Sequence, residues 1–163
     1  MRIALAKNLK LNRIDIDNKV SRCFFILFLL IPTLVRADCW DDAEKRYSVS
    51  KYLLLAIAQH ESGLDPDSIN RNRNGSYDIG LMQINSSWLS ILKPYGIGVA
   101  ELKNPCVNLN IGAWILAKNF SMYGKNWRAV GAYNAKTEWK RASYAQQVAL
   151  KFQKIALKYG IDK

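Results

Sequence analysis

Apolar residues recur at helical spacing in the segment that reads KYLLLAIAQHESG. Leu53, Leu54, Ile57 and Ala58 share one face of a helix, and one more turn along that face brings Glu61 to the end of the stripe. The pattern therefore predicts a buried helix that ends on a carboxylate.

Other amphipathic stretches predict that most of the chain is helical. Asn126 can cap one helix, Gly124 and Gly160 can end two others, and Pro94 and Gly96 stop a third. The last stretch carries Tyr144 among the apolar residues of its buried face. The predicted helices cover 41–47, a segment from Ser48 or Ser50 to 61, 86–92, 106–123, a short segment around Trp127 and Val130, and 139–159.

The segment after Gly63 loses the helical period. It is rich in Asn, Asp, Arg, Gly and Ser, contains the turn pair Asn74-Gly75, and returns to apolar residues at Ile79. We expect a small β-hairpin near residues 70–80. The predicted class is α+β, mainly α, and the absence of internal repeats or low-complexity segments predicts one domain.

Candidate chemistry lies at the end of the first long helix and beyond the hairpin. A carboxyl group held against apolar side chains is poorly hydrated when charged, so we expect a raised pKa for Glu61 and a proton available to a general acid. Asp78, Gln83 and Asn85 offer a carboxylate and two amides around Gly80. That set suits a neutral, hydroxyl-rich ligand.

Three short motifs, Glu61-Ser62, Gly80-Leu81-Met82-Gln83 and Ala132-Tyr133-Asn134-Ala135, follow one another in the chain. In this order and spacing the chain resembles the lysozyme-like lytic transglycosylases, over about residues 38 to 140. It is most similar to the small periplasmic members that accompany secretion systems and pili.

This resemblance implies a lysozyme-like fold and cleavage of peptidoglycan between N-acetylmuramic acid and N-acetylglucosamine. Glu61 would first protonate the glycosidic oxygen and then, as a carboxylate, accept a proton from the C6 hydroxyl that attacks C1 of the same muramic residue. The expected product is a 1,6-anhydro ring, with the substrate's N-acetyl group supporting the charge at C1. The resemblance implies no cofactor.

Asp78 indicates a second possible mechanism for the same set of residues. It stands where animal-type lysozymes place a second carboxylate, and Gln83, Asn85 and Trp88 resemble their sequence too. Lysozyme is the standard example of an enzyme that uses two carboxylates whose pKa values differ. Asp78 can stabilise charge, or only cap the turn at Gly80.

The remaining candidate residues each have a catalytic or binding reading and a structural one. Ser62 can orient Glu61 or satisfy the helix end, and Gly80 can admit the sugar or supply a positive φ. We expect substrate contacts, or bonds to Glu61, from the other members of the set: Met82, Gln83, Asn85, Tyr133, Asn134 and Trp88. Met82 can equally fill the core, and Lys136 replaces the glycine that usually follows the third motif.

The N-terminal 37 residues are predicted to be a secretion signal. An apolar run, CFFILFLLIPTL, follows basic residues and precedes Val35-Arg36-Ala37, so we expect cleavage after Ala37, a mature domain of residues 38–163, and a periplasmic location without stable membrane insertion. An uncleaved inner-membrane anchor is the alternative.

Charge and cysteine content refine this picture. The net charge of +11 falls to +6 without residues 1–37, a value that suits an anionic wall polymer or simple solubility. No basic, aromatic-rich stretch indicates nucleic acid. Cys39 and Cys106 remain as an even pair, so we expect a disulfide, with two buried free thiols as the alternative. His60 is the only histidine, and no metal site is expected.

Three functions are compatible with these residues. The first is a lytic transglycosylase that opens the wall for a secretion system or pilus. The second is a peptidoglycan hydrolase that uses Asp78 directly. The third is an inactive, wall-binding scaffold, which the presence of Glu61, Gln83, Tyr133 and Asn134 argues against.

Overall fold

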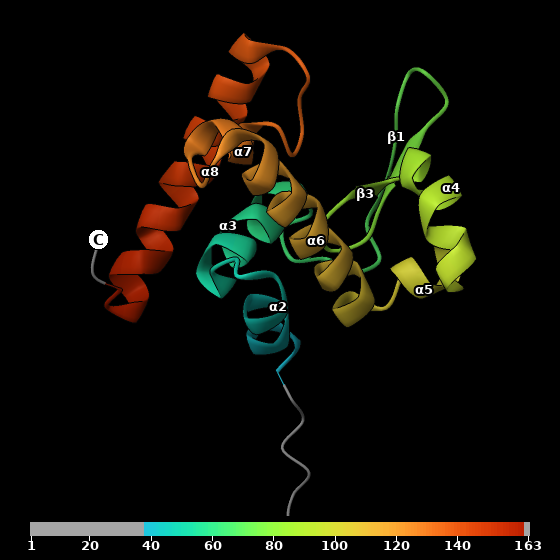
Figure 1. The fold of residues 1–163 in the computed structure, drawn as a ribbon, viewed down its shortest axis with the longest axis horizontal. Coiled ribbons are helices and arrows are strands. Elements are labelled where there is room, and N and C mark those ends of the chain that lie inside the picture. The colour runs from blue at the N-terminus through green and yellow to red at the C-terminus, as the bar shows by residue number, and fades with distance from the viewer. Residues whose placement is uncertain (1–37, 162–163) are drawn as a thin grey trace, which may run out of the picture. The chain divides into compact units, whose positions relative to one another are not determined.

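The computed structural model describes residues 38–161, which form a mainly helical unit with a small sheet (Figure 1). The predicted signal in residues 1–37 lies outside the described residues. Between residues 38 and 161, none of the helices has both the length and the hydropathy needed to cross a membrane.

The predicted helices are present to within about two residues, whereas two short helices, Lys93–Tyr95 and Val99–Leu102, were not predicted. The long segments end where Gly124 and Gly160 predicted, and Asn126 caps the short helix as expected. The helices are α2 (Cys39–Tyr47), α3 (Lys51–Glu61), η1 (Ser86–Trp88), α4 (Leu89–Leu92), η2 (Lys93–Tyr95), α5 (Val99–Leu102), α6 (Pro105–Tyr123), α7 (Trp127–Gly131) and α8 (Glu138–Tyr159).

The predicted hairpin is present, and a third strand extends it. Strands β1 (Ile69–Arg71), β2 (Tyr77–Ile79) and β3 (Ile84–Asn85) form an antiparallel sheet in that order. Asp78 lies in the middle strand, opposite Asn70 on one side and Asn85 on the other. The register therefore gathers a carboxylate and two amides across neighbouring strands.

Helix α6 runs through the middle of the fold (Figure 1), and α2, α3 and α7 all contact it. Helix α3 also packs against α8, so its apolar face is enclosed from two sides. Leu54, Ile57 and Ala58 are completely buried there, as their spacing predicted. The same face leads directly to Glu61.

A buried asparagine joins α6 to the sheet. Asn108 donates to the carbonyl oxygens of Ile79 and Leu102, each at 2.8 Å, and accepts from the Met82 backbone N–H at 2.7 Å. Its amide is fully buried and satisfied by these three bonds. The backbone between β2 and β3 is thereby fixed against the central helix.

The expected disulfide between Cys39 and Cys106 is present. It joins the first residue of α2 to the N-terminal turn of α6, with a sequence separation of 67 residues. Since a long loop loses much entropy when it is closed in the unfolded chain, this bond contributes strongly to stability in the chain-entropy description.

We predict that replacing both cysteines, Cys39→Ser with Cys106→Ser, lowers the free energy of unfolding by roughly 3–4 kcal/mol. Chemical denaturation of the oxidised protein and of the double variant measures the difference. The double variant leaves no unpaired thiol. Equal midpoints and equal slopes for the two proteins would contradict the prediction.

Candidate active site

A cleft of about 900 Å³ opens beside the C-terminal end of α3. Its lining comes from four parts of the chain: the end of α3, the sheet with η1, Ile115 of α6, and the α7–α8 loop with the first turn of α8. The residues predicted from the sequence that line it are Glu61, Asp78, Gln83, Asn85, Trp88, Tyr133 and Asn134.

Glu61 is the last residue of α3, and most of its carboxyl group is shielded from water. Burial raises the pKa of Glu61 to about 7, a hydrogen bond from Tyr144 opposes this shift, and the charge of Asp78 adds to it. The group is therefore partly protonated at neutral pH. A carboxyl in this state can both give and take a proton.

The partner of Glu61 is Tyr144, whose hydroxyl donates a short hydrogen bond to Glu61 Oε1. Tyr144 lies in α8, only 5% exposed, with the His60 ring packed edge-on at 5.0 Å between ring centroids. The sequence pattern placed Tyr144 on the buried face but gave it no part in the site. A phenol within an apolar stripe was the available signal, because a buried hydroxyl needs a partner.

Asp78 faces the same cleft from β2. Its two carboxylate oxygens accept hydrogen bonds from the side-chain amides of Asn72, at 2.9 Å, and Asn85, at 2.6 Å. These neutral donors fix the carboxylate without neutralising its charge. Asp78 therefore presents an oriented negative charge to the cleft that contains Glu61.

Gln83 and Asn85 spend most of their bonding capacity inside the protein. The Gln83 amide donates to the carbonyls of Gly80 and Ser68 at 2.8 and 3.2 Å, and its oxygen accepts from Asn70 at 2.7 Å. Asn85 donates to Asp78 and Ser76, and its oxygen caps η1 through the Ser87 N–H at 3.0 Å. The hydrogen bonds of Gln83 and Asn85 therefore fix the backbone and side chains that form the cleft wall.

Two predicted partners of Glu61 bind elsewhere. Ser62 donates to the Leu81 carbonyl at 2.8 Å, and Tyr133 donates to the Met82 carbonyl at 2.9 Å. Neither hydroxyl bonds to Glu61. Both reach the free carbonyls of the turn between β2 and β3, because that turn lies between the end of α3 and the end of α7. They attach the turn to the two helices.

Met82 and Gly80 are not among the residues that line the cleft, so the structure agrees with the structural role expected as the alternative for each. Met82 is completely buried, and its side chain packs where a Cβ on Gly112 of α6 would lie. Gly80 has φ of +72°, and a Cβ there would stand 2.6 Å from the Asn108 amide nitrogen. Close packing on α6 therefore requires glycine at this position.

Trp88 and Asn134 are open to the cleft. The Trp88 ring packs edge-on against Trp114 at 5.4 Å between centroids, with the Lys118 ammonium 5.6 Å from the Trp88 centroid. Asn134 is exposed, and its side chain makes no hydrogen bond within residues 38–161. The amide of Asn134 is thus free for a ligand.

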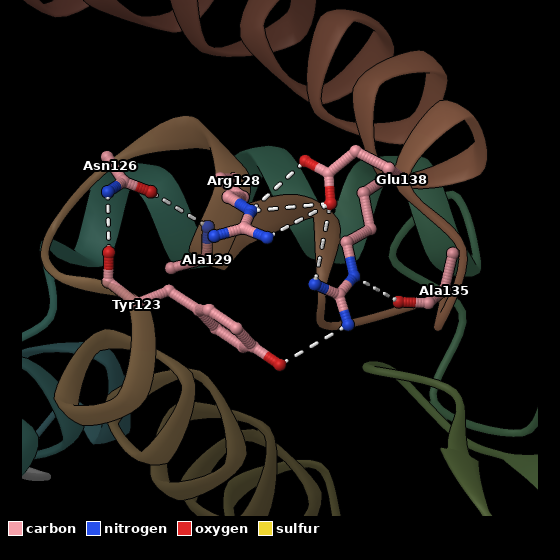
Figure 2. Close-up of polar contacts among 7 residues, drawn as sticks. Tyr123, Asn126, Arg128, Ala129, Ala135 and Glu138 are labelled. Carbon is pink, nitrogen blue, oxygen red and sulfur yellow. Dashed lines mark hydrogen bonds and ion pairs between the residues drawn. The ribbon is translucent and has the colours of Figure 1, made fainter.

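A polar cluster of Arg128, Glu138, Arg141 and Tyr123 contacts the loop between α7 and α8 at Ala135 (Figure 2). Tyr133 and Asn134 precede Ala135 in this loop. Arg141 Nε donates to the Ala135 carbonyl at 3.0 Å, and the Arg141 guanidinium lies 4.8 Å from the centre of the Tyr123 ring. Glu138 pairs with Arg128 at 3.1 Å and with Arg141 at 3.8 Å. This cluster connects the ends of α6 and α7 to the start of α8.

The described residues contain no group of three or more His, Cys, Asp or Glu side chains able to hold a metal ion. The burial of His60 lowers its pKa, and its ring packs on Tyr144. The chemistry available in the cleft is therefore that of the Glu61 proton, the Asp78 charge and the surrounding amides.

We predict that the stability cost of ionising Glu61 can be measured without any substrate. The folded protein keeps the proton to about pH 7, whereas a glutamate exposed in the unfolded chain has its ordinary pKa of 4.5. Wild type therefore has its full unfolding free energy below pH 4.5, where Glu61 is protonated in both the folded and the unfolded chain. It loses part of that free energy as the pH rises from 4.5 through about 7, because the folded protein disfavours the charged carboxylate. From pH 5 to pH 8, Glu61→Gln should therefore gain about 2–3 kcal/mol in unfolding free energy relative to wild type.

Denaturant unfolding of both proteins at several pH values provides this comparison. Asp67→Asn serves as the matched control, since it removes a carboxylate from an exposed position outside the cleft lining. If the difference between Glu61→Gln and wild type stayed constant with pH, a raised pKa for Glu61 would be wrong.

Comparison with known proteins identifies the family to which this chain belongs. The family model described as transglycosylase SLT domain matches residues 38–156. The chain is 43% identical to Protein IpgF of Shigella flexneri over 142 residues, 84% of this chain and 93% of that protein. It is 46% identical to Invasion protein IagB of Salmonella typhimurium strain SL1344 over 131 residues, 78% of this chain and 82% of that protein.

A solved structure shares the fold. The lytic transglycosylase Slt of Pseudomonas aeruginosa, as its inactive mutant E503Q, superposes with a TM-score of 0.63 at 21% identity. The match covers 88% of this chain but only 28% of that one, so the likeness concerns the lysozyme-like fold. With the family model covering the whole described core, the chain belongs to the transglycosylase SLT domain family.

Proposed function

We propose that this protein is a peptidoglycan lytic transglycosylase that cleaves the β-1,4 bond between N-acetylmuramic acid and N-acetylglucosamine. The observation that carries the proposal is the buried Glu61 carboxyl, with a pKa of about 7, at the lining of a cleft rich in amides. A glycan strand is neutral along its sugar backbone and suits such a lining.

In the proposed reaction, protonated Glu61 gives its proton to the glycosidic oxygen, and the bond to C1 of the muramic residue breaks. The Glu61 carboxylate then takes the proton of the C6 hydroxyl as that oxygen bonds to C1. Glu61 recovers its proton, and water is not consumed. The Tyr144 hydroxyl stabilises the intermediate carboxylate, since it donates to Glu61 Oε1.

Asp78 supports the alternative, a lysozyme-type hydrolase. Its charge is oriented by Asn72 and Asn85 and acts on Glu61 across the cleft. In a lysozyme this second carboxylate stabilises the charge at C1 or bonds to it, and water completes the reaction. In our proposal Asp78 contributes only electrostatic support.

The biological setting is also a proposal. We infer that residues 1–37 direct export and that the mature domain, residues 38–163, acts in the periplasm, opening the wall locally for a secretion system or pilus. Support comes from relatives: one is named an invasion protein, and another, from Escherichia coli O157:H7 and 37% identical over 145 residues, a peptidoglycan-binding-like protein.

Products released from purified peptidoglycan test the reaction. Mass spectrometry should find 1,6-anhydro-muropeptides, each lighter by one water than the hydrolytic product, and Glu61→Gln should lower their rate of formation by at least about 10³-fold. Reducing ends in place of anhydro ends would establish the hydrolase instead. Strand binding without turnover by wild type would favour the scaffold.

We predict that Tyr144→Phe lowers kcat about 10- to 100-fold, because a hydrogen bond to a charged group is lost. It should also shift the alkaline limb of the pH profile upward, since that bond holds down the pKa of Glu61. Tyr133→Phe is the matched control: its hydroxyl binds the Met82 carbonyl, so the limb should not move. Identical profiles for wild type and Tyr144→Phe would argue against the role of Tyr144.

A further inference from the structure

Three cationic side chains line the cleft. Arg73 comes from the turn between β1 and β2, Lys136 from the α7–α8 loop, and Lys140 from the first turn of α8. The ion pairs found in residues 38–161 involve other residues, so none of these three cations is neutralised by a carboxylate of the described chain.

The carboxylates of the cleft lining form no ion pair with these three cations and offset their charge only in part. Asp78 is occupied by the amides of Asn72 and Asn85, and Glu61 is largely shielded by burial. Glu138, which is close in sequence to Lys136 and Lys140, pairs with Arg128 and Arg141. An anionic ligand would therefore meet three cations that are not paired with a carboxylate, against the one exposed negative charge of Asp78.

The position of Lys136 is fixed by its neighbours. Ala135 is buried, its carbonyl accepts from Arg141, and the Arg141 side chain is only 13% exposed. Gly131 lies so close to the Arg141 backbone that a Cβ would stand 2.4 Å from its carbonyl oxygen. The backbone on either side of Ala135 is thus held in place (Figure 2). Asn134 and Lys136, its two neighbours in the chain, both line the cleft.

Lys136 and Lys140 also sit where cations are locally unfavourable. Lys136 precedes the N-cap Thr137 of α8, and Lys140 is in the first turn, where the helix dipole favours negative charge. Lys140 instead extends over the Trp139 ring, 5.3 Å from its centroid. The helix dipole therefore gives no reason for either lysine, and the contact with Trp139 accounts for Lys140 alone, whereas an anionic ligand would account for both.

We propose that Lys136 and Lys140, with Arg73 from the sheet, bind carboxylate groups attached to the muramic acid residues of a glycan strand. The cleft would then prefer acidic strands to neutral ones. This inference rests on the proposed function, because it takes a peptidoglycan strand as the ligand. Two sources share this chemistry, the carboxylates of the stem peptide and the lactyl carboxylate of a muramic residue without peptide.

The test compares three forms of soluble, uncross-linked strands with the purified protein. The first bears stem peptides with free carboxylates, the second is the same material with those carboxylates converted to neutral methylamides, and the third has lost its peptides to an amidase and carries free lactyl carboxylates. We expect wild type to show a KM about 3- to 10-fold lower on the first form than on the second.

The double variant Lys136→Gln with Lys140→Gln should raise KM on acidic strands by about the same 3- to 10-fold, with kcat changed less than about twofold, and should leave KM on methylamide strands unaltered. Lys136→Arg with Lys140→Arg should restore the wild-type KM. The matched control, Lys154→Gln with Lys158→Gln, removes the same charge from the far part of α8, about 20 Å away along the helix, and should change nothing.

The outcomes separate clearly. If the double variant Lys136→Gln with Lys140→Gln has a raised KM on the third form, the lysines contact lactyl carboxylates. If its KM is raised on the first form alone, they contact the stem peptide. Both results support the inference. An unchanged KM on every acidic strand, or an equal rise on the methylamide strands, overturns it.

Binding of fluorescent strands to Glu61→Gln variants, with and without the lysine substitutions, gives the same comparison without turnover. Failure of the proposed reaction would appear separately, as the absence of anhydro ends from all three strand forms with wild type. The binding comparison would still decide whether these lysines recognise carboxylates.

Discussion

The enclosure of one carboxyl group governs the arrangement of the rest of the site. Glu61 ends an apolar helix face that α6 and α8 cover, so ionising its side chain means placing a charge where little water can reach it. One strong donor, Tyr144, is present and reduces this cost, but burial remains the larger effect. The balance leaves a group that changes charge near neutral pH.

The polar residues around Glu61 form two sets: one binds the backbone between β2 and β3, and the other binds the Asp78 carboxylate. Asn108, Ser62 and Tyr133 satisfy the backbone of the turn between β2 and β3 and hold it to α6, α3 and α7. Asn72 and Asn85 hold Asp78 in the sheet. Most of the polar side chains that surround the cleft therefore build its walls, whereas the Asn134 side chain makes no hydrogen bond within residues 38–161 and is free for a ligand.

Periodicity and caps predicted the helices and the hairpin because both depend on local sequence. The third strand escaped prediction because it has only two residues, Ile84 and Asn85, and exists through its pairing with β2. The position of Glu61 at the end of an apolar stripe was likewise a local property, so its raised pKa could be anticipated.

Side-chain partners could not be predicted in the same way, because they depend on which distant elements meet. Tyr133 was a plausible partner of Glu61, yet the bond comes from Tyr144, since α8 and not the α7–α8 loop crosses the end of α3. The sequence left open whether Met82 contacts substrate or fills the core, and a glycine in α6 makes room for its side chain inside the core. Both outcomes require the tertiary packing.

The attachment of α2 to α6 has a consequence for the order of biosynthesis. Helix α2 is made early, but α6, the helix that it contacts most, and its disulfide partner, Cys106, which lies 67 residues further along the chain, are synthesised later. At elongation rates of about 5–20 residues per second, α2 waits several seconds for that helix. The nascent N-terminal segment must therefore stay unaggregated until α6 emerges, and a premature partner for Cys39 would trap the chain.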